Sequence, residues 1–320
     1  MSRDSGCRQA RVGTNLRSGL YRPRRSAVDA VREVHRLLCR GYTDVVDADL
    51  SKYFDTIPHS DLLKSVTRRI VDRTVLWLIK LWLKTPVEER DSKGGRRMSG
   101  GKSSTSGTPQ GGVLSPLLSV IYMNRFLKHW RLSGRCEAYR AHVISYADDF
   151  VILSRGHAEE ALAWTEVVMT KLGLTLNEEK TSVKDARRES FDFLGYSLGP
   201  RRFPNGGRWY LGAAPSKKSV QRIKRKISDL LVPGNMGAWP QVRASLNRLL
   251  GGWAAYFSYG SLASAHQAVD RHVYDRVLAF LRRRHKAPGR GVRQFSHEFC
   301  GDTGVLVLNR VRRRSPTCAL

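Results

Sequence analysis

Two short apolar runs near the middle of the chain restrict the fold more than any other feature. Residues 142–146 and 150–153 are strand-like, and Ala147-Asp148-Asp149 connects them, a pattern typical of a β-hairpin. A helical pattern follows at 158–172, and another strand is expected at 43–50. Because strands alternate with helices around a central hairpin, the sequence predicts an α+β, ferredoxin-like sheet with its helices on one face.

The segments beyond this sheet divide into loops, short strands and helices. Short strands are expected near 174–176 and around 193–198. Residues 91–112 are rich in Gly, Ser and Lys and are expected to be a loop, whereas 200–215, rich in Gly, Pro and Arg, are expected to be a domain junction. After residue 215 the apolar pattern is helical only, so the C-terminal part is predicted to be an all-α bundle of three amphipathic helices.

Positive charge is in large excess and is concentrated toward the C-terminus. The chain has 56 Lys and Arg residues against 28 Asp and Glu, a net charge of +28. Residues 201–320 hold 23 of the basic residues and 5 of the acidic ones, a net charge of +18. So large an excess destabilises a protein through self-repulsion unless a polyanion binds it. A nucleic acid is therefore expected as the partner, in preference to a surface whose charge only improves solubility.

Composition excludes several other classes of protein. The longest apolar runs fall short of the roughly 18 residues that a membrane-spanning helix requires, so no membrane partner is expected. No apolar segment follows the first residues in the manner of a secretory signal, and a cytoplasmic location is expected. The five cysteines are scattered, without the spacing of a zinc site or a disulfide framework, and are assigned no chemistry.

Three acidic residues stand where acidic side chains are structurally uncommon. Asp49 ends an otherwise apolar strand, and Asp148 and Asp149 lie side by side at the expected hairpin tip. Each has an ordinary explanation, since Asp is a common turn residue and strand-end acids are often solvated. Joining a nucleotide to a 3′-hydroxyl, however, requires two Mg²⁺ ions about 3.5–4 Å apart, and Mg²⁺ prefers carboxylate oxygens. Because neighbouring strands lie about 4.8 Å apart, the three acids could converge on such a metal pair.

Three ordered motifs resemble the reverse transcriptases encoded by group II introns. Tyr146-Ala147-Asp148-Asp149 resembles the Tyr-x-Asp-Asp box of that family, and residues 49–55 resemble its first acidic motif. Thr108-Pro109-Gln110-Gly111-Gly112, followed by Ser115-Pro116, resembles its Pro-Gln-Gly loop. The motifs occur in the family's order and with its spacing. The chain is thus identified as similar to a group II intron-encoded reverse transcriptase/maturase.

The resemblance implies an RNA-directed DNA polymerase, a nucleotidyltransferase that uses two Mg²⁺ ions, for which Mn²⁺ can substitute. Asp49, Asp148 and Asp149 would be the catalytic metal ligands, and Lys180 would give a proton to the departing pyrophosphate. Without the motif, Lys180 is more simply explained as a surface charge.

The resemblance also implies sites for the nucleotide and the primer. Phe54 would be a steric gate that fills the space of a ribose 2′-hydroxyl, although an ordinary core aromatic is the preferred explanation without the motif. The full nucleotide-binding set would be Leu50, Phe54, Gln110 and Gly111. The primer grip would be a hairpin formed by Phe193, Leu194, Gly195 and Tyr196.

The C-terminal part resembles the maturase-specific domain that follows the polymerase in this family. The matching features are the basic helix at 216–231, Gly252-Trp253-Ala254-Ala255-Tyr256-Phe257 and Arg282-Arg283-Arg284-His285-Lys286. They imply a thumb that also binds intron RNA, mainly through backbone charge and shape. Helix core and a solvated helix end are the ordinary explanations. The residues expected to bind RNA are Lys217, Lys218, Arg222, Arg225, Arg282, Arg283, Arg284 and Lys286.

The resemblance further implies partners and a division into domains. The expected partners are intron RNA, an RNA template, a DNA primer and deoxynucleoside triphosphates, and the oligomeric state is left open. The expected domains are a disordered segment at 1–18, a polymerase palm with the end of the fingers at 19–199, the junction at 200–215, a maturase-specific thumb at 216–308 and a basic tail at 309–320.

The resemblance begins late in the family's pattern, at about Gly19. Family members carry N-terminal fingers, whose basic residues hold the triphosphate, ahead of the segment that residues 19–26 resemble, so we expect a chain that lacks most of its fingers. Two functions stay open: RNA-templated DNA synthesis in intron mobility, and a non-catalytic RNA-binding splicing cofactor or inactive fragment. The intact acids favour the first and the missing fingers favour the second. A reverse transcriptase of defence or diversification is disfavoured by the maturase-like C-terminal part.

Overall fold

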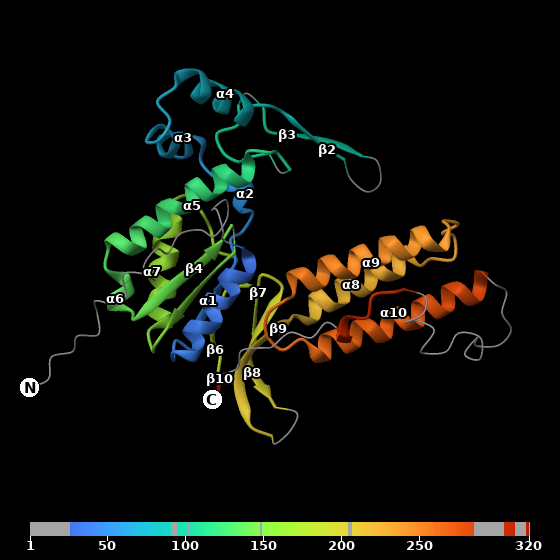
Figure 1. Ribbon diagram of the computed structural model, residues 1–320. Helices are drawn as coiled ribbons and strands as arrows, with labels where there is room; N and C mark the ends of the chain where they lie inside the picture. The colour runs from blue at the N-terminus through green and yellow to red at the C-terminus, as the bar shows by residue number, and fades with distance from the viewer. Residues whose placement is uncertain are drawn as a thin grey trace, which may run out of the picture. The chain divides into compact units, whose positions relative to one another are not determined.

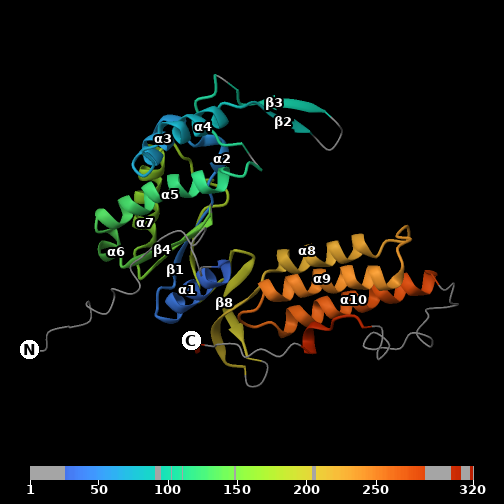
Figure 2. The same cartoon turned by 45° about the horizontal axis from the view of Figure 1, so that its top comes forward.

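The chain forms two compact units, Met1–Asp185 and Ala186–Leu320 (Figures 1 and 2). The structure is a computed structural model that describes residues 26–90, 95–101, 103–109, 111–147, 149–203, 207–284, 304–310 and 318–319. The expected disorder at 1–18 and most of the expected basic tail lie outside the described residues. Within the described ranges, no helix has both the length and the apolar composition needed to cross a membrane. Where the functional domains begin and end stays a prediction.

Helices and strands alternate in the first unit. Its helices are α1 (Ala27–Cys39), α2 (Tyr53–Thr56), α3 (His59–Thr67), α4 (Arg73–Leu83), α5 (Ser115–Leu132), α6 (Arg135–Ala138) and α7 (Ala158–Lys171). Its strands are β1 (Asp44–Ala48), β2 (Val87–Arg90), β3 (Arg96–Ser99), β4 (Ala141–Tyr146), β5 (Asp149–Ser154) and β6 (Ser182–Asp185). The prediction of a loop at 91–112 is wrong for β3, because backbone pairing with β2 makes a strand of a segment whose composition is loop-like.

The main sheet of the first unit has four antiparallel strands in the order β4-β5-β1-β6. With the helices between them, β1, β4, β5 and β6 follow the βαββαβ pattern, and the predicted mixed α/β class is confirmed. The predicted hairpin is β4 and β5. The strand expected at 174–176 is instead an isolated bridge between Leu176 and Leu50. The sheet's fourth strand is β6, whose polar sequence carries no apolar alternation.

Helices cover both faces of this sheet, so the prediction of helices on one face is wrong (Figure 1). Neighbouring residues of a strand point to opposite faces, yet Val45 and Val46 of β1 are both completely buried. Val46 belongs to the core formed with α5 and α7. On the other face α1 packs against β4 and β5 and buries Val31 and Val34. A capping box between Ser26 and Asp29 starts α1 and fixes where it begins.

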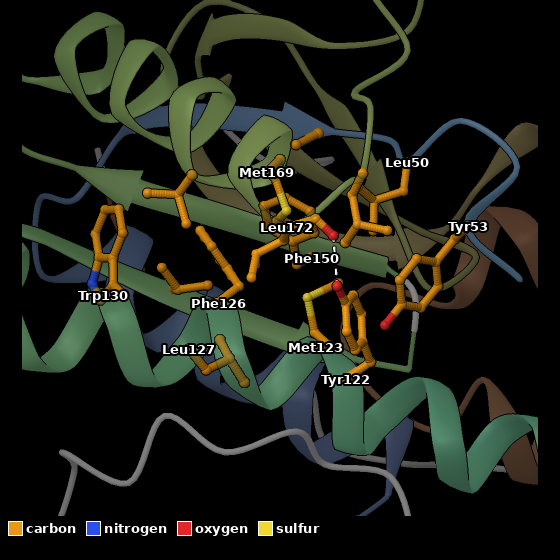
Figure 3. Packing of buried hydrophobic residues seen from close by; sticks show 14 of the residues in the cluster. Leu50, Tyr53, Tyr122, Met123, Phe126, Leu127, Trp130, Phe150, Met169 and Leu172 are labelled. Atoms are coloured by element: carbon orange, nitrogen blue, oxygen red, sulfur yellow. Dashed lines mark hydrogen bonds between the residues drawn. The ribbon is translucent and has the colours of Figure 1, made fainter. Parts of the chain in front are cut away.

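The core between the sheet, α5 and α7 is rich in aromatic side chains (Figure 3). Tyr122 and Phe126 lie one turn apart on α5, as their spacing predicts, and both are completely buried. The ring of Phe126 lies 5.5 Å from that of Phe150 on β5. The hydroxyl of Tyr122 donates a hydrogen bond of 2.6 Å to the carbonyl of Leu172, which ties α5 to the end of α7. These contacts hold β5, and with it Asp149, at a fixed place on the sheet.

The second unit combines a small sheet with three helices. Its strands, in the antiparallel order β10-β9-β8-β7, are β7 (Phe191–Phe193), β8 (Tyr196–Arg202), β9 (Trp209–Pro215) and β10 (Cys318–Ala319). Its helices are α8 (Lys217–Leu230), α9 (Trp239–Tyr256), α10 (Ala263–Arg284) and the short 3₁₀ turn η2 (Leu308–Arg310). Most of the segment 200–215, predicted to be a junction between domains, lies in the hairpin of β8 and β9, whose backbone groups pair along seven residues of each strand.

The three helices expected in the C-terminal part are present as α8, α9 and α10. Each buries the apolar stripe that predicted it, for example Ile223 and Ile227 on α8 and Leu246 and Leu250 on α9. Ser216 caps α8 by accepting a hydrogen bond from the backbone of Ser219. The compact unit is not all-α, because the sheet of β7 to β10 belongs to it.

Candidate active site

Two of the predicted metal ligands face each other across neighbouring strands. The register of β1 and β5 pairs Ala48 with Phe150, so the residue after Ala48, which is Asp49, lies opposite the first residue of β5, which is Asp149. Directly opposed side chains in an antiparallel pair have Cβ atoms roughly 4.5–5.5 Å apart. Ala48 and Phe150 point into the core, so Asp49 and Asp149 lie on the opposite face, where both are open to solvent.

Lys180 lies beside Asp49. Its Nζ atom is 3.1 Å from Oδ2 of Asp49, and the Asp49 side chain is 42% exposed. The backbone holds this pair in place, since Asn177 donates to the carbonyl of Asp49 at 2.8 Å. Asp49 in turn donates through its backbone to the hydroxyl of Thr181 at 3.4 Å. The motif around Lys180 is therefore attached to the acidic end of β1, so two segments far apart in sequence meet.

Asp148, the third predicted ligand, lies outside the described residues, as does Gln110. In the described part of the chain, no group of three or more His, Cys, Asp and Glu side chains is placed to hold a metal ion. The donor set that is present still fits a hard divalent cation. Asp49 and Asp149 offer hard oxygen ligands from opposed positions, and like charges directly opposite each other are destabilising unless a cation compensates them.

Phe54 is joined to the start of the Pro-Gln-Gly loop. It is half-buried in α2, where its ring lies 5.7 Å from that of Tyr53. Its carbonyl accepts hydrogen bonds from the backbone and hydroxyl of Thr108, at 2.6 and 3.3 Å. The half-buried ring therefore has a solvent-accessible part, as a nucleotide contact requires. Leu50 is only 9% exposed and packs in the core (Figure 3). Any contact of Leu50 with a nucleotide would therefore be made by its main chain.

Gly111 and Gly112 of the Pro-Gln-Gly motif occupy positions that suit glycine. Gly111 has φ +79°, a conformation that side chains rarely adopt, and it is exposed. A Cβ on Gly112 would lie 2.5 Å from the indole of Trp82 and 2.9 Å from the hydroxyl of Ser115. That same hydroxyl donates to the carbonyl of Pro109 and so links the loop to the first turn of α5.

The predicted primer grip is a two-residue hairpin turn in the second unit. Phe193 pairs with Tyr196 across β7 and β8, and Leu194 and Gly195 between them have φ +50° and +77°. Positive φ at both turn positions is the geometry of a type I′ turn, which matches the twist of a hairpin. The four residues predicted to act together thus form one structural element.

Two helices hold this turn through hydrogen bonds that the sequence did not predict. The hydroxyl of Tyr256, at the end of α9, donates to the carbonyl of Leu194 at 2.9 Å. At the start of α8, the backbone of Ser216 and the hydroxyl of Ser219 donate to the carbonyl of Gly195 at 2.9 and 2.8 Å. Tyr196 completes the set by donating to the carbonyl of Tyr256 at 2.9 Å. The sequence did not predict these bonds because the partners are distant along the chain, 24 residues for Ser219 and 62 for Tyr256.

Most of the basic residues predicted to bind RNA are exposed on helix surfaces. Lys217, Lys218, Arg222 and Arg225 on α8 and Arg282 and Arg283 at the end of α10 are all exposed. Arg284 is also used inside the unit, because its guanidinium donates to the carbonyl of Gly237 at 2.6 Å and stacks on Phe280. Lys286 lies outside the described residues.

Comparison with known proteins defines the class of this chain. Residues 16–198 match the family described as reverse transcriptase (RNA-dependent DNA polymerase), and residues 220–297 match the maturase-specific domain of group II introns. The chain therefore belongs to the reverse transcriptase family and carries the maturase domain of group II intron proteins. Enzymes of this family are RNA-directed DNA polymerases that use divalent metal ions.

Relatives support the same family. Protein YkfC of Escherichia coli K12 is 33% identical over 235 residues, which cover 62% of this chain and 59% of YkfC. The group II intron-encoded protein LtrA of Lactococcus lactis is 26% identical over 278 residues, which cover 67% of this chain and 43% of LtrA. The chain thus spans less than two thirds of either relative. A telomerase from Candida albicans, solved with a fragment of telomeric RNA, aligns with 90% of this chain and 53% of its own at 12% identity and a TM-score of 0.44.

Proposed function

We propose that this chain is an RNA-directed DNA polymerase whose reaction takes place at Asp49 and Asp149, with Asp148 as the third ligand. The observation that carries the proposal is the opposition of Asp49 and Asp149 across β1 and β5, on the solvent-accessible face of the sheet. Two carboxylates so close together are unfavourable by themselves. They are favourable only beside a cation, and Lys180 or a metal ion provides one.

These carboxylates would hold two Mg²⁺ ions, with Mn²⁺ as a substitute. When bound, the ions neutralise the charge that develops on the transferred phosphoryl group and its leaving group. The protein would contribute positioning and electrostatic stabilisation. Positioning and electrostatic stabilisation supply most of the rate in phosphoryl transfer, and the rigid core beneath β5 keeps the carboxylates in place.

Lys180 would act as the proton donor to the departing pyrophosphate. Its ammonium group already lies 3.1 Å from Asp49, which is close enough to the acids to reach a leaving group held between them. Before the reaction, Lys180 would lessen the repulsion between the two acids.

Substrate selection would fall to Phe54 and the Pro-Gln-Gly loop. The ring of Phe54 would exclude a ribose 2′-hydroxyl and so select deoxynucleotides. Gln110 and Gly111 would contact the incoming nucleotide and template, with Gly111 allowing close backbone approach. Because Thr108 bonds to the carbonyl of Phe54, a shift of the loop would move the gate with it.

The second unit would hold the primer and bind the intron RNA. The turn at Leu194 and Gly195 would contact the primer backbone, held by Tyr256 and Ser219. The exposed cations of α8 and the end of α10 would bind RNA phosphates, which accounts for the net charge of +18 in residues 201–320. The chain would then act as polymerase palm, thumb and maturase domain of a group II intron protein.

Primer extension tests the catalytic part of the proposal. The purified chain is given an RNA template annealed to a DNA primer, deoxynucleotides and Mg²⁺, and labelled DNA is measured. Asp49→Asn and Asp149→Asn should each lower synthesis by at least about 100-fold, since each removes a charge from the reaction centre. Glu159→Gln, an exposed acid on α7, is the matched control and should leave synthesis unchanged.

The result also separates the enzyme from a non-catalytic splicing cofactor. Synthesis that survives in the two Asn variants contradicts the catalytic assignment. No synthesis by the unchanged chain, together with tight RNA binding, would instead favour the splicing cofactor. RNA binding should weaken steeply with salt and fall in the double variant Arg282→Glu/Arg283→Glu, which spares the structural bond of Arg284.

A further inference from the structure

A groove runs between α8 and α10, away from the turn and from the Arg cluster at the end of α10. The two helices lie side by side and run parallel, because His272 contacts Lys224 and Arg276 contacts Ser228, one turn further along both helices. The groove has a volume of about 420 Å³. Its lining residues are Lys224, Ser264, Gln267, Ala268, Arg271, His272 and Asp275.

The walls of this groove are fixed by hydrogen bonds from α10 to carbonyl oxygens of α8. Nε2 of His272 lies 3.0 Å from the carbonyl of Lys224, and the guanidinium of Arg276 donates to the carbonyl of Ser228 at 3.3 Å. A carbonyl only accepts, so Nε2 of His272 carries a hydrogen and Nδ1 is the nitrogen that takes up a second proton. The groove is therefore present before any ligand binds.

Three charged side chains of the groove form no ion pair or hydrogen bond with the described part of the protein. Among the residues that the structure describes, the side chains of Lys224, Arg271 and Asp275 form neither an ion pair nor a hydrogen bond. Arg271 and Asp275 are exposed and stand one turn apart on α10. The groove thus offers two cations and one carboxylate to a ligand, and Ser264 and Gln267 add neutral polar groups.

This combination selects among anionic ligands. Two cations attract phosphates, but the carboxylate of Asp275 repels them and can accept only from a hydroxyl or another donor. An RNA strand offers both groups in alternation, since each nucleotide carries a phosphate and a ribose 2′-hydroxyl. DNA offers the phosphate alone. A helix rises about 1.5 Å per residue, so the wall from Ser264 to Asp275 is roughly 16 Å long and covers several nucleotides of an extended strand.

We propose that the groove between α8 and α10 binds an RNA strand, with backbone phosphates at Lys224 and Arg271 and a ribose 2′-hydroxyl at Asp275. The inference rests on the proposed RNA binding by the second unit, and it adds residues and a preference for RNA over DNA that the exposed cations of α8 do not provide. Lys217 extends the same surface, because it lies two turns before Lys224 on one edge of α8.

Fluorescence anisotropy with the full chain tests this site. The probes are a short labelled oligouridine RNA and the deoxyuridine strand of the same length. Asp275→Ala should lower affinity for the RNA by about tenfold or more, as the loss of a hydrogen bond to a charged group does, and should leave affinity for the DNA equal or higher. The double variant Lys224→Gln/Arg271→Gln should weaken binding of both strands. It should also reduce the slope of log K against log salt by about 1.4, or 0.7 for each lost phosphate contact.

Arg248→Gln removes an exposed cation from α9, outside the groove, and is the matched control. It should change the RNA-to-DNA preference very little. Equal losses for RNA and DNA in Asp275→Ala would overturn the ribose contact, and a double variant no weaker than Arg248→Gln would overturn the groove. In either case, RNA binding that still depends on Arg282 and Arg283 would leave the proposed function standing. An unchanged chain that binds no RNA would contradict both.

Proton uptake gives a second readout at the same site. Burial lowers the pKa of His272, and the charges of Lys224 and Arg276 lower it further, while its hydrogen bond to the Lys224 carbonyl and the charge of Asp275 raise it. A phosphate seated beside Lys224 and Arg271 should raise that pKa. An NMR titration of the His272 ring should therefore move to higher pH when oligouridine is added, and an unmoved titration would count against a phosphate in the groove.

Discussion

The hydroxyl of Tyr256 donates a hydrogen bond of 2.9 Å to the carbonyl of Leu194, at the tip of the hairpin between β7 and β8. Leu194 has φ +50°, a conformation that costs a residue with a side chain roughly 1–2 kcal/mol. The turn keeps this conformation because α8 and α9 donate hydrogen bonds to its carbonyls. The predicted primer grip is therefore held by the helices of the maturase domain.

Tyr256→Phe should lower the free energy of unfolding by about 1 kcal/mol, the usual contribution of one hydrogen bond. The ring would stay, with its contacts to Tyr196 and Phe257, so packing should be little changed. Urea denaturation followed by circular dichroism measures the difference. Tyr146→Phe is the control, because no partner of its hydroxyl is found among the described residues, and its stability should stay within about 0.5 kcal/mol of the unchanged chain.

Two glycines should respond in opposite directions to alanine. Gly112→Ala would place a Cβ 2.5 Å from Trp82, and overpacking of this kind typically costs about 1–3 kcal/mol. Gly252→Ala adds a methyl group inside α9 with nothing within 4 Å, which should stabilise the helix by roughly 0.5–1 kcal/mol. Thermal unfolding of both variants measures the signs. A stable Gly112→Ala protein would mean that the Pro-Gln-Gly loop is not packed against Trp82 as described.

Cys136 should react slowly with alkylating reagents at neutral pH. Burial, and to a smaller extent the charge of the nearby Glu137, raise the pKa of its thiol to about 11. Because only the thiolate is nucleophilic, the reaction rate should rise about tenfold per pH unit and level off only above that pKa. A variant that keeps Cys136 as its single cysteine, treated with iodoacetamide between pH 7 and 10, measures the profile. A plateau near pH 8.5 would show an exposed, ordinary thiol.

Strands and helices with a clear apolar period could be predicted from the sequence. The central hairpin and the three C-terminal helices follow their apolar periods, so they were predictable. The second helical layer was also present in the sequence, because the unbroken run Phe150-Val151-Ile152-Leu153 is typical of a strand buried on both faces. β6 was not predictable from apolar alternation. Its four residues are half-buried and polar in part, and pairing with β1 alone makes them a strand.

In the candidate site, the sequence predicted the acidic residues but not the residues that hold them in place. Its acids were found from motifs, and the register of β1 and β5 brings Asp49 and Asp149 together, as convergence of strand ends suggests. The partners that hold the site were missed because they are distant in sequence and ordinary in type. Lys184, for example, pairs with Asp47 at 2.8 Å on the same face as Asp49, and only the pairing of β6 with β1 brings it there.

Mn²⁺-dependent thermal unfolding measures whether the opposed acids Asp49 and Asp149 bind metal. In the unchanged chain, Mn²⁺ at a hundred times its Kd should stabilise the folded state by about 2.7 kcal/mol and raise the melting temperature. Without metal, Asp149→Asn should unfold at an equal or higher temperature, because it relieves the repulsion with Asp49. Asp49→Asn and Asp149→Asn should each abolish the Mn²⁺-dependent rise, whereas Glu159→Gln should keep it. A rise that persists undiminished in both Asn variants would contradict a shared metal site at Asp49 and Asp149.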